Sequence, residues 1–184
     1  PVLSRIRLQE LDQTVQAALT IAGGVLGDLS VFSELAALFR QGEVPEGFSR
    51  PVAAFLVQHM SPAELLAILR DAHCDLDART RLAEALGNTD KIALVPDLLA
   101  ILRARVIIEM VRVAIADAVG MLGETPETAR ELLDLLRASE IADRLHQTAV
   151  PDAIYRALWS VSRRAGVMVV ETRPGSKIYR VVPR

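Results

Sequence analysis

The sequence predicts an all-α fold, a solenoid of four to five antiparallel helix pairs that ends in a C-terminal β-hairpin. Three observations support this prediction: a seven-residue phrase recurs along the chain, a second phrase recurs between its copies, and the last residues change to a β-branched pattern. A repeat period of roughly 20 to 50 residues is typical of solenoids, in which each unit buries its apolar face only against its neighbours. Residues 1–184 are therefore expected to be a single repeat domain, with helical repeats over 1–166 and a hairpin tail over 167–184.

The first phrase places apolar residues at positions i, i+1, i+4 and i+5, as in the segment 97–103, Asp-Leu-Leu-Ala-Ile-Leu-Arg. Its copies end at arginines spaced by 30, 33 and 34 residues, namely Arg40, Arg70, Arg103 and Arg137. This spacing puts a continuous apolar stripe on one face of a helix. The stripe leucines are therefore expected to form one continuous core, among them Leu65, Leu69, Leu98, Leu102, Leu132 and Leu136.

The second phrase occupies residues 79–87 and, at an offset of 33 residues, 112–120. Both copies carry alanine and larger aliphatic residues, and alanine would let neighbouring helices approach closely. Each copy ends in a glycine, Gly87 or Gly120, which is suited to a left-handed helix cap. The repeat unit is thus a helix, a short turn, a second helix and another short turn.

Local signals mark where helices begin. Ser61-Pro62-Ala63-Glu64 is a capping box with proline at the first helical position, where its missing N–H costs nothing. Pro51 and Pro126 are expected to begin helices in a similar way. The stretch 139–147 is compatible with a further short helical piece. The expected helices span residues 2–21, 29–40, 50–60, 62–71, 77–87, 93–103, 106–121, 126–137 and 151–165.

The period changes after Gly166. Residues 167–172 and 177–182 are strand-like, and the Pro-Gly turn of residues 173–176 separates them, which predicts a β-hairpin. The hairpin is expected to cover the open apolar end of the stack, as terminal repeats must.

The paired-helix unit resembles HEAT repeats, most closely the short bacterial subtype also found in phycobilisome-lyase-like proteins. The motifs that carry the resemblance are the Ala-Leu-Gly ending of the first helix and the Val-Pro-x-Leu-Leu-x-x-Leu opening of the second, best matched over 77–102 and 109–136. Residues 157–167 also look like the close of HEAT arrays appended to large bacterial NACHT-type signalling ATPases. No G-x-x-x-x-G-K loop occurs here, so any ATPase part would lie outside this chain.

Composition narrows the class of protein. Hydrophobic residues make up 51 % of the chain and aromatic residues 4 %, so the core must be aliphatic. Charges interrupt the apolar stretches too often for a membrane span of about 20 residues. No signal peptide is visible at the start, and one cysteine, Cys74, fits a reducing compartment, so a cytoplasmic location is expected.

The sequence predicts no catalytic residue, no metal site and no cofactor. His59, His73 and His146 are scattered, and none has a second ligand at a metal-binding helical spacing. Cys74 is expected to be a small buried or half-buried residue, because a nucleophilic cysteine needs a base and a helix-terminal or cationic setting. Trp159, beside Leu158 in a predicted helix, is expected to lie in the core.

Charge is distributed unevenly along the chain. Residues 1–155 carry 14 Lys/Arg against 22 Asp/Glu, a net −8, whereas residues 156–184 carry 7 against 1, a net +6. The repeated arginines could form a basic ladder, or each could simply favour the negative end of its helix dipole, which is the interpretation we prefer. The basic tail could bind nucleic acid, or its charges could serve the fold. We prefer the second interpretation, because the acidic body repels a polyanion and the tail holds one aromatic residue, Tyr179.

The expected function is therefore that of a non-enzymatic scaffold or sensor module for protein–protein interaction, within a larger bacterial signalling protein. Its partner would be a protein whose identity the sequence does not give, and its partner-binding residues are predicted to be Arg70, Arg103, Arg137, Arg173, Lys177 and Arg180.

The alternative is a HEAT-like enzyme or enzyme subunit, either bilin-lyase-like or DNA-glycosylase-like. A deep pocket with convergent polar groups would favour the enzyme, and a shallow groove would favour the scaffold. The resemblance to HEAT-like glycosylases implies aromatic residues and an acid on a basic face, which the acidic body argues against.

Overall fold

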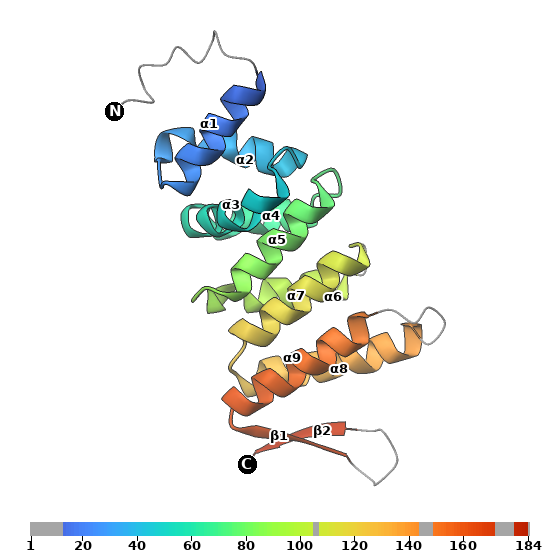
Figure 1. The fold of residues 1–184 in the computed structure, drawn as a ribbon. Coiled ribbons are helices and arrows are strands. Elements are labelled where there is room, and N and C mark those ends of the chain that lie inside the picture. Colours follow the sequence, from blue (N-terminus) through green and yellow to red (C-terminus); the bar gives the residue numbers. More distant parts are fainter. Residues whose placement is uncertain (1–12, 105–106, 144–148, 172–178, 184) are drawn as a thin grey trace. The chain divides into compact units, whose positions relative to one another are not determined.

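The computed structural model describes residues 13–104, 107–143, 149–171 and 179–183, which are mostly α-helical and end in a small antiparallel sheet (Figure 1). Contacts within the chain divide it into two compact units, residues 1–82 and residues 83–184. The boundary between the units falls inside helix α5 (Leu76–Gly87). No helix in the described part of the chain is both long enough and apolar enough to cross a membrane.

The first unit consists of helices α1 to α4 and the beginning of α5. Its core is aliphatic apart from the buried rings of Phe39 and Phe55, and it includes the predicted stripe residues Leu65 and Leu69, both fully buried. The elements are α1 (Gln13–Val25), the 3-10 helix η3 (Leu29–Val31), α2 (Phe32–Gln41), α3 (Glu46–His59) and α4 (Pro62–Arg70).

The predicted capping box at the start of α4 is confirmed. The backbone N–H of Glu64 donates to Ser61 Oγ at 3.4 Å, and the backbone N–H of Ser61 donates to Glu64 Oε2 at 2.9 Å. Ser61 Oγ also donates to Glu64 Oε2 at 2.6 Å. This hydrogen bond and the one from the Ser61 backbone N–H lower the pKa of the Glu64 carboxyl, because they stabilise its charged form. A local sequence signal was sufficient here because both partners lie within one turn.

Three predicted helix ends are wrong by four residues or more. Helix α1 ends at Val25 and not at residue 21. Helix α3 begins at Glu46, so Pro51 lies inside the helix and does not begin it. The first turn forms earlier because the Phe48 N–H already donates to the carbonyl of Pro45 at 2.8 Å. Helix α8 (Pro126–Asp143) continues past residue 137 into the stretch expected to be a separate piece, since residues 138–143 contain neither glycine nor proline.

The buried side chain of Arg79 caps the C-terminal end of α4 within the first unit. Its Nε and Nη2 donate to the carbonyl of Leu69 at 3.2 and 2.8 Å. A cationic donor at the last carbonyls of a helix satisfies an acceptor that the helix leaves unpaired and lies at the negative end of its dipole. Sequence reasoning did not find this contact.

The second unit contains the end of α5 and the remaining elements. Helix α7 contacts α6 and α9, α8 contacts α6 and α9, and the arrangement can be followed in Figure 1. The predicted stripe residues Leu98, Leu102, Leu132 and Leu136 are buried in this unit. The elements not yet bounded are the 3-10 helix η4 (Ile92–Leu94), α6 (Val95–Arg103), α7 (Glu109–Leu122), α9 (Val150–Arg164), β1 (Val167–Glu171) and β2 (Tyr179–Pro183).

Gly87 and Gly120 are not left-handed caps, contrary to the prediction. Neither has a positive φ, and both are buried residues of a helix, α5 and α7 respectively. A Cβ built on Gly120 would lie 2.9 Å from the Cα of Ala157, and one built on Gly87 would lie 3.1 Å from the Cα of Ala118. The absence of a side chain lets the backbones approach, so these glycines serve helix packing.

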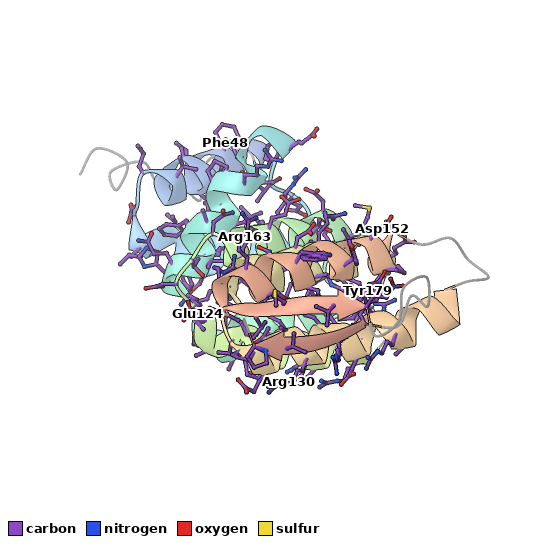
Figure 2. All side chains as sticks on the ribbon, turned by 90° about the horizontal axis from the view of Figure 1, so that it is seen from below. Phe48, Glu124, Arg130, Asp152, Arg163 and Tyr179 are labelled. Carbon is purple, nitrogen blue, oxygen red and sulfur yellow. The ribbon has the colours of Figure 1, made fainter. Side chains whose placement is uncertain are left out.

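The predicted hairpin strands are confirmed as an antiparallel pair, and the turn expected at 173–176 lies outside the described residues. Val167 pairs with Pro183 and Glu171 with Tyr179 at the two ends of the register. Strand β1 contacts α9 and β2 contacts α8, with Val169 buried and Arg137 Nη2 donating to the carbonyl of Tyr179. Figure 2 shows the two strands from below, lying over α8 and α9.

Candidate interaction surface

The same close contact between a glycine and an alanine joins α5 to α7 and α7 to α9. Gly87 of α5 lies against Ala118 of α7, and Gly120 of α7 lies against Ala157 of α9. Ala157 therefore takes the place in α9 that Ala118 takes in α7, at an offset of 39 residues. On this alignment the glycine position of α9 is occupied by Trp159. The position of the buried alanines Ala83 and Ala116 is occupied by Tyr155.

The expectation that Trp159 lies in the core is therefore wrong. Its side chain is 45 % exposed and that of Tyr155 is 41 % exposed. The buried side of α9 is formed by Ile154, Ala157 and Leu158, and a residue two positions after Ala157 is turned by about 200° around the helix. Trp159 consequently lies on the side of α9 that faces away from α7.

The two aromatic rings contact each other on that exposed side. Their centroids lie 6.1 Å apart with an interplanar angle of 71°, the edge-to-face arrangement that aromatic rings prefer. Asp152, Tyr155, Trp159 and Arg163 are all exposed and are spaced by three or four residues, so they form one stripe along α9. We call these four residues the end stripe. Figure 2 labels Asp152 and Arg163 toward the two ends of α9.

A shallow groove of about 280 Å³ runs between α7 and α9. Gly120 and Ala157 lie at the close contact of the two helices, and Met121, 45 % exposed, lines the groove beside them. The Arg156 Nη2 and the Asp117 Oδ1 form an ion pair across it at 3.1 Å. The remaining lining residue is Ser160. The groove thus combines apolar atoms with one charged pair and one hydroxyl.

A second hollow, of about 360 Å³, lies within the first unit and is lined by residues that include Phe39, Asp75 and Asp77. Two of its lining carboxylates, Asp75 and Asp77, stabilise the beginning of α5. Asp75 Oδ1 accepts the backbone N–H of Ala78 at 2.9 Å, and Asp77 Oδ1 pairs with Arg81 Nε at 3.2 Å. These acids therefore stabilise the beginning of α5, and their hydrogen bonds do not converge on the hollow.

The predicted partner-binding arginines lie in varied settings. Arg70 is exposed in the last turn of α4, as the helix-end interpretation expects, and Arg180 is exposed on β2. Arg103 pairs with Glu131 of α8 at 2.5 Å, and Arg137 pairs with Asp134 at 3.1 Å. Arg137 lies inside α8 and not at its end, because that helix continues to Asp143. Arg173 and Lys177 lie outside the described residues.

Cys74 is buried, which agrees with the prediction of a small buried or half-buried residue. Burial raises the pKa of its thiol, and the carboxylate of Asp71 raises it further. A thiol with a raised pKa is a poor nucleophile at neutral pH, because little of it is ionised. Within the part of the chain that the structure describes, no group of three or more His, Cys, Asp or Glu residues could hold a metal ion.

One residue of the basic tail has a structural role. Arg164 Nε and Nη2 donate to the carbonyl of Gly123 at 3.1 and 2.7 Å, Nη2 also reaches the carbonyl of Gly120, and Nη1 donates to Ser160 Oγ at 3.0 Å. Arg164 therefore satisfies carbonyls at the end of α7 and ties α9 to it.

Replacing Arg164 with alanine is expected to lower the free energy of unfolding by about 1–3 kcal/mol, because charge-assisted hydrogen bonds to backbone carbonyls are lost. The matched control is Arg163→Ala, one residue away, exposed in the same turn, with an expected change within about 0.5 kcal/mol. Urea denaturation in dilute solution measures both. Equal effects of the two substitutions would contradict the structural role of Arg164.

Comparisons of this chain with protein-family models, with curated proteins and with solved structures found no match.

Proposed function

We propose that this chain is a non-catalytic scaffold or sensor module for protein–protein interaction, built as a HEAT-like α-solenoid of four to five helix pairs within a larger bacterial signalling protein. The repeated glycine–alanine contact supports the architecture, because it joins α5 to α7 and α7 to α9 in the same way. Repeat stacks of this kind present extended surfaces to partners.

The groove between α7 and α9 is the observation that carries the functional part of the proposal. Its volume of about 280 Å³ is at or below the low end of small-molecule pockets, which run from roughly 300 to 1,000 Å³. It is shallow and lies on the surface of two packed helices. A groove of this size suits one or two side chains that protrude from a partner protein, with Met121 as an adaptable apolar contact.

The ion pair between Arg156 and Asp117 would help to orient a partner protein bound at the groove. Arg156 and Asp117 neutralise each other, so a partner that approaches the groove can pair with either group by displacing the other. Exposed ion pairs of this kind contribute at most about 1 kcal/mol to stability, so their rearrangement on binding is inexpensive. The groove therefore has an apolar contact and two polar groups that can adapt.

The test uses two exposed methionines of the same helix. Met121→Glu places a charge in the groove, whereas Met110→Glu places one on α7 outside it; the two side chains are 45 % and 52 % exposed. A partner is first identified by affinity enrichment with the intact chain, and its binding to each purified variant is then measured by calorimetry. We expect Met121→Glu to weaken binding at least tenfold, about 1.4 kcal/mol, and Met110→Glu to leave it unchanged.

Partner binding that does not depend on Met121 would contradict the groove as the interaction site. An enriched partner that binds only the unfolded chain would contradict the scaffold function as well. Circular dichroism of each variant separates loss of binding from loss of fold.

A further inference from the structure

We propose that the end stripe of α9 is a self-association surface, on which a second copy of this chain packs its own α9 in the antiparallel direction. This inference rests on the proposed repeat architecture and names one partner of it, the same chain. It uses a different surface from the groove, which lies on the side of α9 toward α7.

The first argument is the interrupted repeat. In the inner helices Gly87 of α5 and Gly120 of α7 lie against the next helix, and the alanines four residues before them, Ala83 and Ala116, are buried. In α9 the equivalent residues are Tyr155 and Trp159. Two large rings thus replace the small residues in α9. This is also the helix that is followed by β1 and not by another helix.

The second argument is the exposure of those rings. The hairpin packs on α8 and α9, yet it leaves Tyr155 41 % and Trp159 45 % exposed. Tyrosine and tryptophan are enriched at the centres of protein interfaces, where an apolar body is buried and one polar atom keeps a partner. An edge-to-face pair on a helix surface is already ordered, so little side-chain freedom is lost when it is covered.

The third argument is the placement of charge around the rings. Asp152 lies in the first turn of α9 and Arg163 in the last turn, both exposed, and neither has an ion-pair partner among the described residues. They are 11 residues apart, or roughly 16 Å along the helix, with the aromatic pair midway between them. The order along the stripe is therefore acid, aromatic, aromatic, base. When two such stripes run in opposite directions, the acid of each faces the base of the other.

A two-fold axis through the middle of the stripe makes use of this pattern. Asp152 of one copy then faces Arg163 of the second copy, the reciprocal pair forms at the other end, and the aromatic residues meet at the centre. Such an interface is isologous, as a closed dimer requires. A parallel arrangement would instead place like charges against each other. Antiparallel helices also oppose their dipoles favourably.

The strength of the dimer follows from its size. Stable interfaces bury about 1,200–2,000 Å² in total, and one helix stripe supplies less than this unless neighbouring surface contributes. We therefore expect a dissociation constant in the micromolar range. Because Trp159 is the only tryptophan of the chain, its fluorescence reports directly on the proposed interface.

The experiment measures sedimentation equilibrium and tryptophan emission of the whole chain across a concentration series. We expect reversible dimerisation and a blue shift of the emission as the concentration rises through the micromolar range. Asp152→Arg and Arg163→Asp, each alone, place like charges at both ends of the stripe and should weaken dimerisation at least tenfold. Arg130→Asp, on the exposed surface of α8, is the control and should leave it unchanged.

Mixing the two variants tests whether the charges pair directly. One variant then carries a cation at both ends of its stripe and the other an anion at both ends, so heterodimers should form more strongly than either weakened homodimer. The double variant, with Asp152→Arg and Arg163→Asp in one chain, tests whether the charge pairing can be restored. It should dimerise with itself again, because antiparallel packing then brings opposite charges together at both ends. The single reversals test the direction, because in a parallel dimer like charges would face each other before and after each reversal. Thermal melts in dilute solution confirm that each variant folds.

A chain that stays monomeric with an unshifted emission would overturn the proposal, and so would a dimer indifferent to both charge reversals. These failures are distinct from failure of the proposed function. Partner binding at the groove is tested by Met121→Glu, which leaves the end stripe intact, and the charge reversals leave the groove intact.

Discussion

Replacing Leu99 with alanine is expected to lower the free energy of unfolding by about 2–5 kcal/mol, the usual range for a buried leucine whose cavity is not refilled. Leu99 is the second leucine of the copied phrase in α6, and only 1 % of it is exposed. The loss combines the transfer free energy of the removed methyl groups with the contacts that the cavity leaves unmade. Urea denaturation measures the change.

The control for Leu99 is the same substitution at an exposed leucine. Leu26 lies just after α1 and is 79 % exposed, so Leu26→Ala should change the free energy of unfolding by no more than about 0.5 kcal/mol. Similar effects at Leu99 and Leu26 would mean that the repeat phrase does not mark the core. Leu133 of α8, 4 % exposed, occupies the same place in its copy and should behave as Leu99 does.

The helices were predictable because their signals are local and repeated. The capping box and the apolar period set both ends of α4, expected at 62–71 and found at Pro62–Arg70. The same reasoning located the strands of the hairpin, where β-branched residues are concentrated. Periodicity of this kind depends only on residues a few positions apart, and one sequence contains all of it.

The errors concern contacts between segments far apart in the chain. Gly87 and Gly120 looked like helix caps because glycine commonly ends helices, whereas their actual role depends on Ala118 and Ala157 in the next helix. Arg137 was expected at a helix end, yet its helix continues and its guanidinium reaches β2. Such roles depend on which helix lies opposite, and periodicity does not contain that information.

The candidate surface was missed for a related reason. Trp159 follows a leucine in an amphipathic helix, and a large apolar residue in that setting is usually part of the core. The available signal was the series Ala85-Leu86-Gly87, Ala118-Val119-Gly120 and Ala157-Leu158-Trp159, in which a tryptophan replaces glycine in the last member. Only the contacts of Gly120 with Ala157 established that the third member belongs to the series.

Replacing Gly120 with alanine is expected to destabilise the protein, although alanine is the better helix former by about 1 kcal/mol. The new Cβ would lie 2.9 Å from the Cα and 3.1 Å from the Cβ of Ala157, and backbone atoms cannot turn aside as a flexible side chain can. Helices α7 and α9 must separate, and overpacking of this kind costs about 1–3 kcal/mol. We therefore expect a net loss in thermal and urea denaturation.

Gly47→Ala is the matched control, because Gly47 also lies in a helix, α3, and a Cβ there would meet nothing within 4 Å. With no steric term, the lower entropy of the unfolded chain dominates, and the variant should be unchanged or more stable by up to about 1 kcal/mol. The same substitution thus has opposite signs at two helical glycines. If Gly120→Ala proved as stabilising as Gly47→Ala, α7 and α9 would not be held together at this contact. The equivalence of Trp159 with the inner glycines, on which the end stripe depends, would then lose its basis.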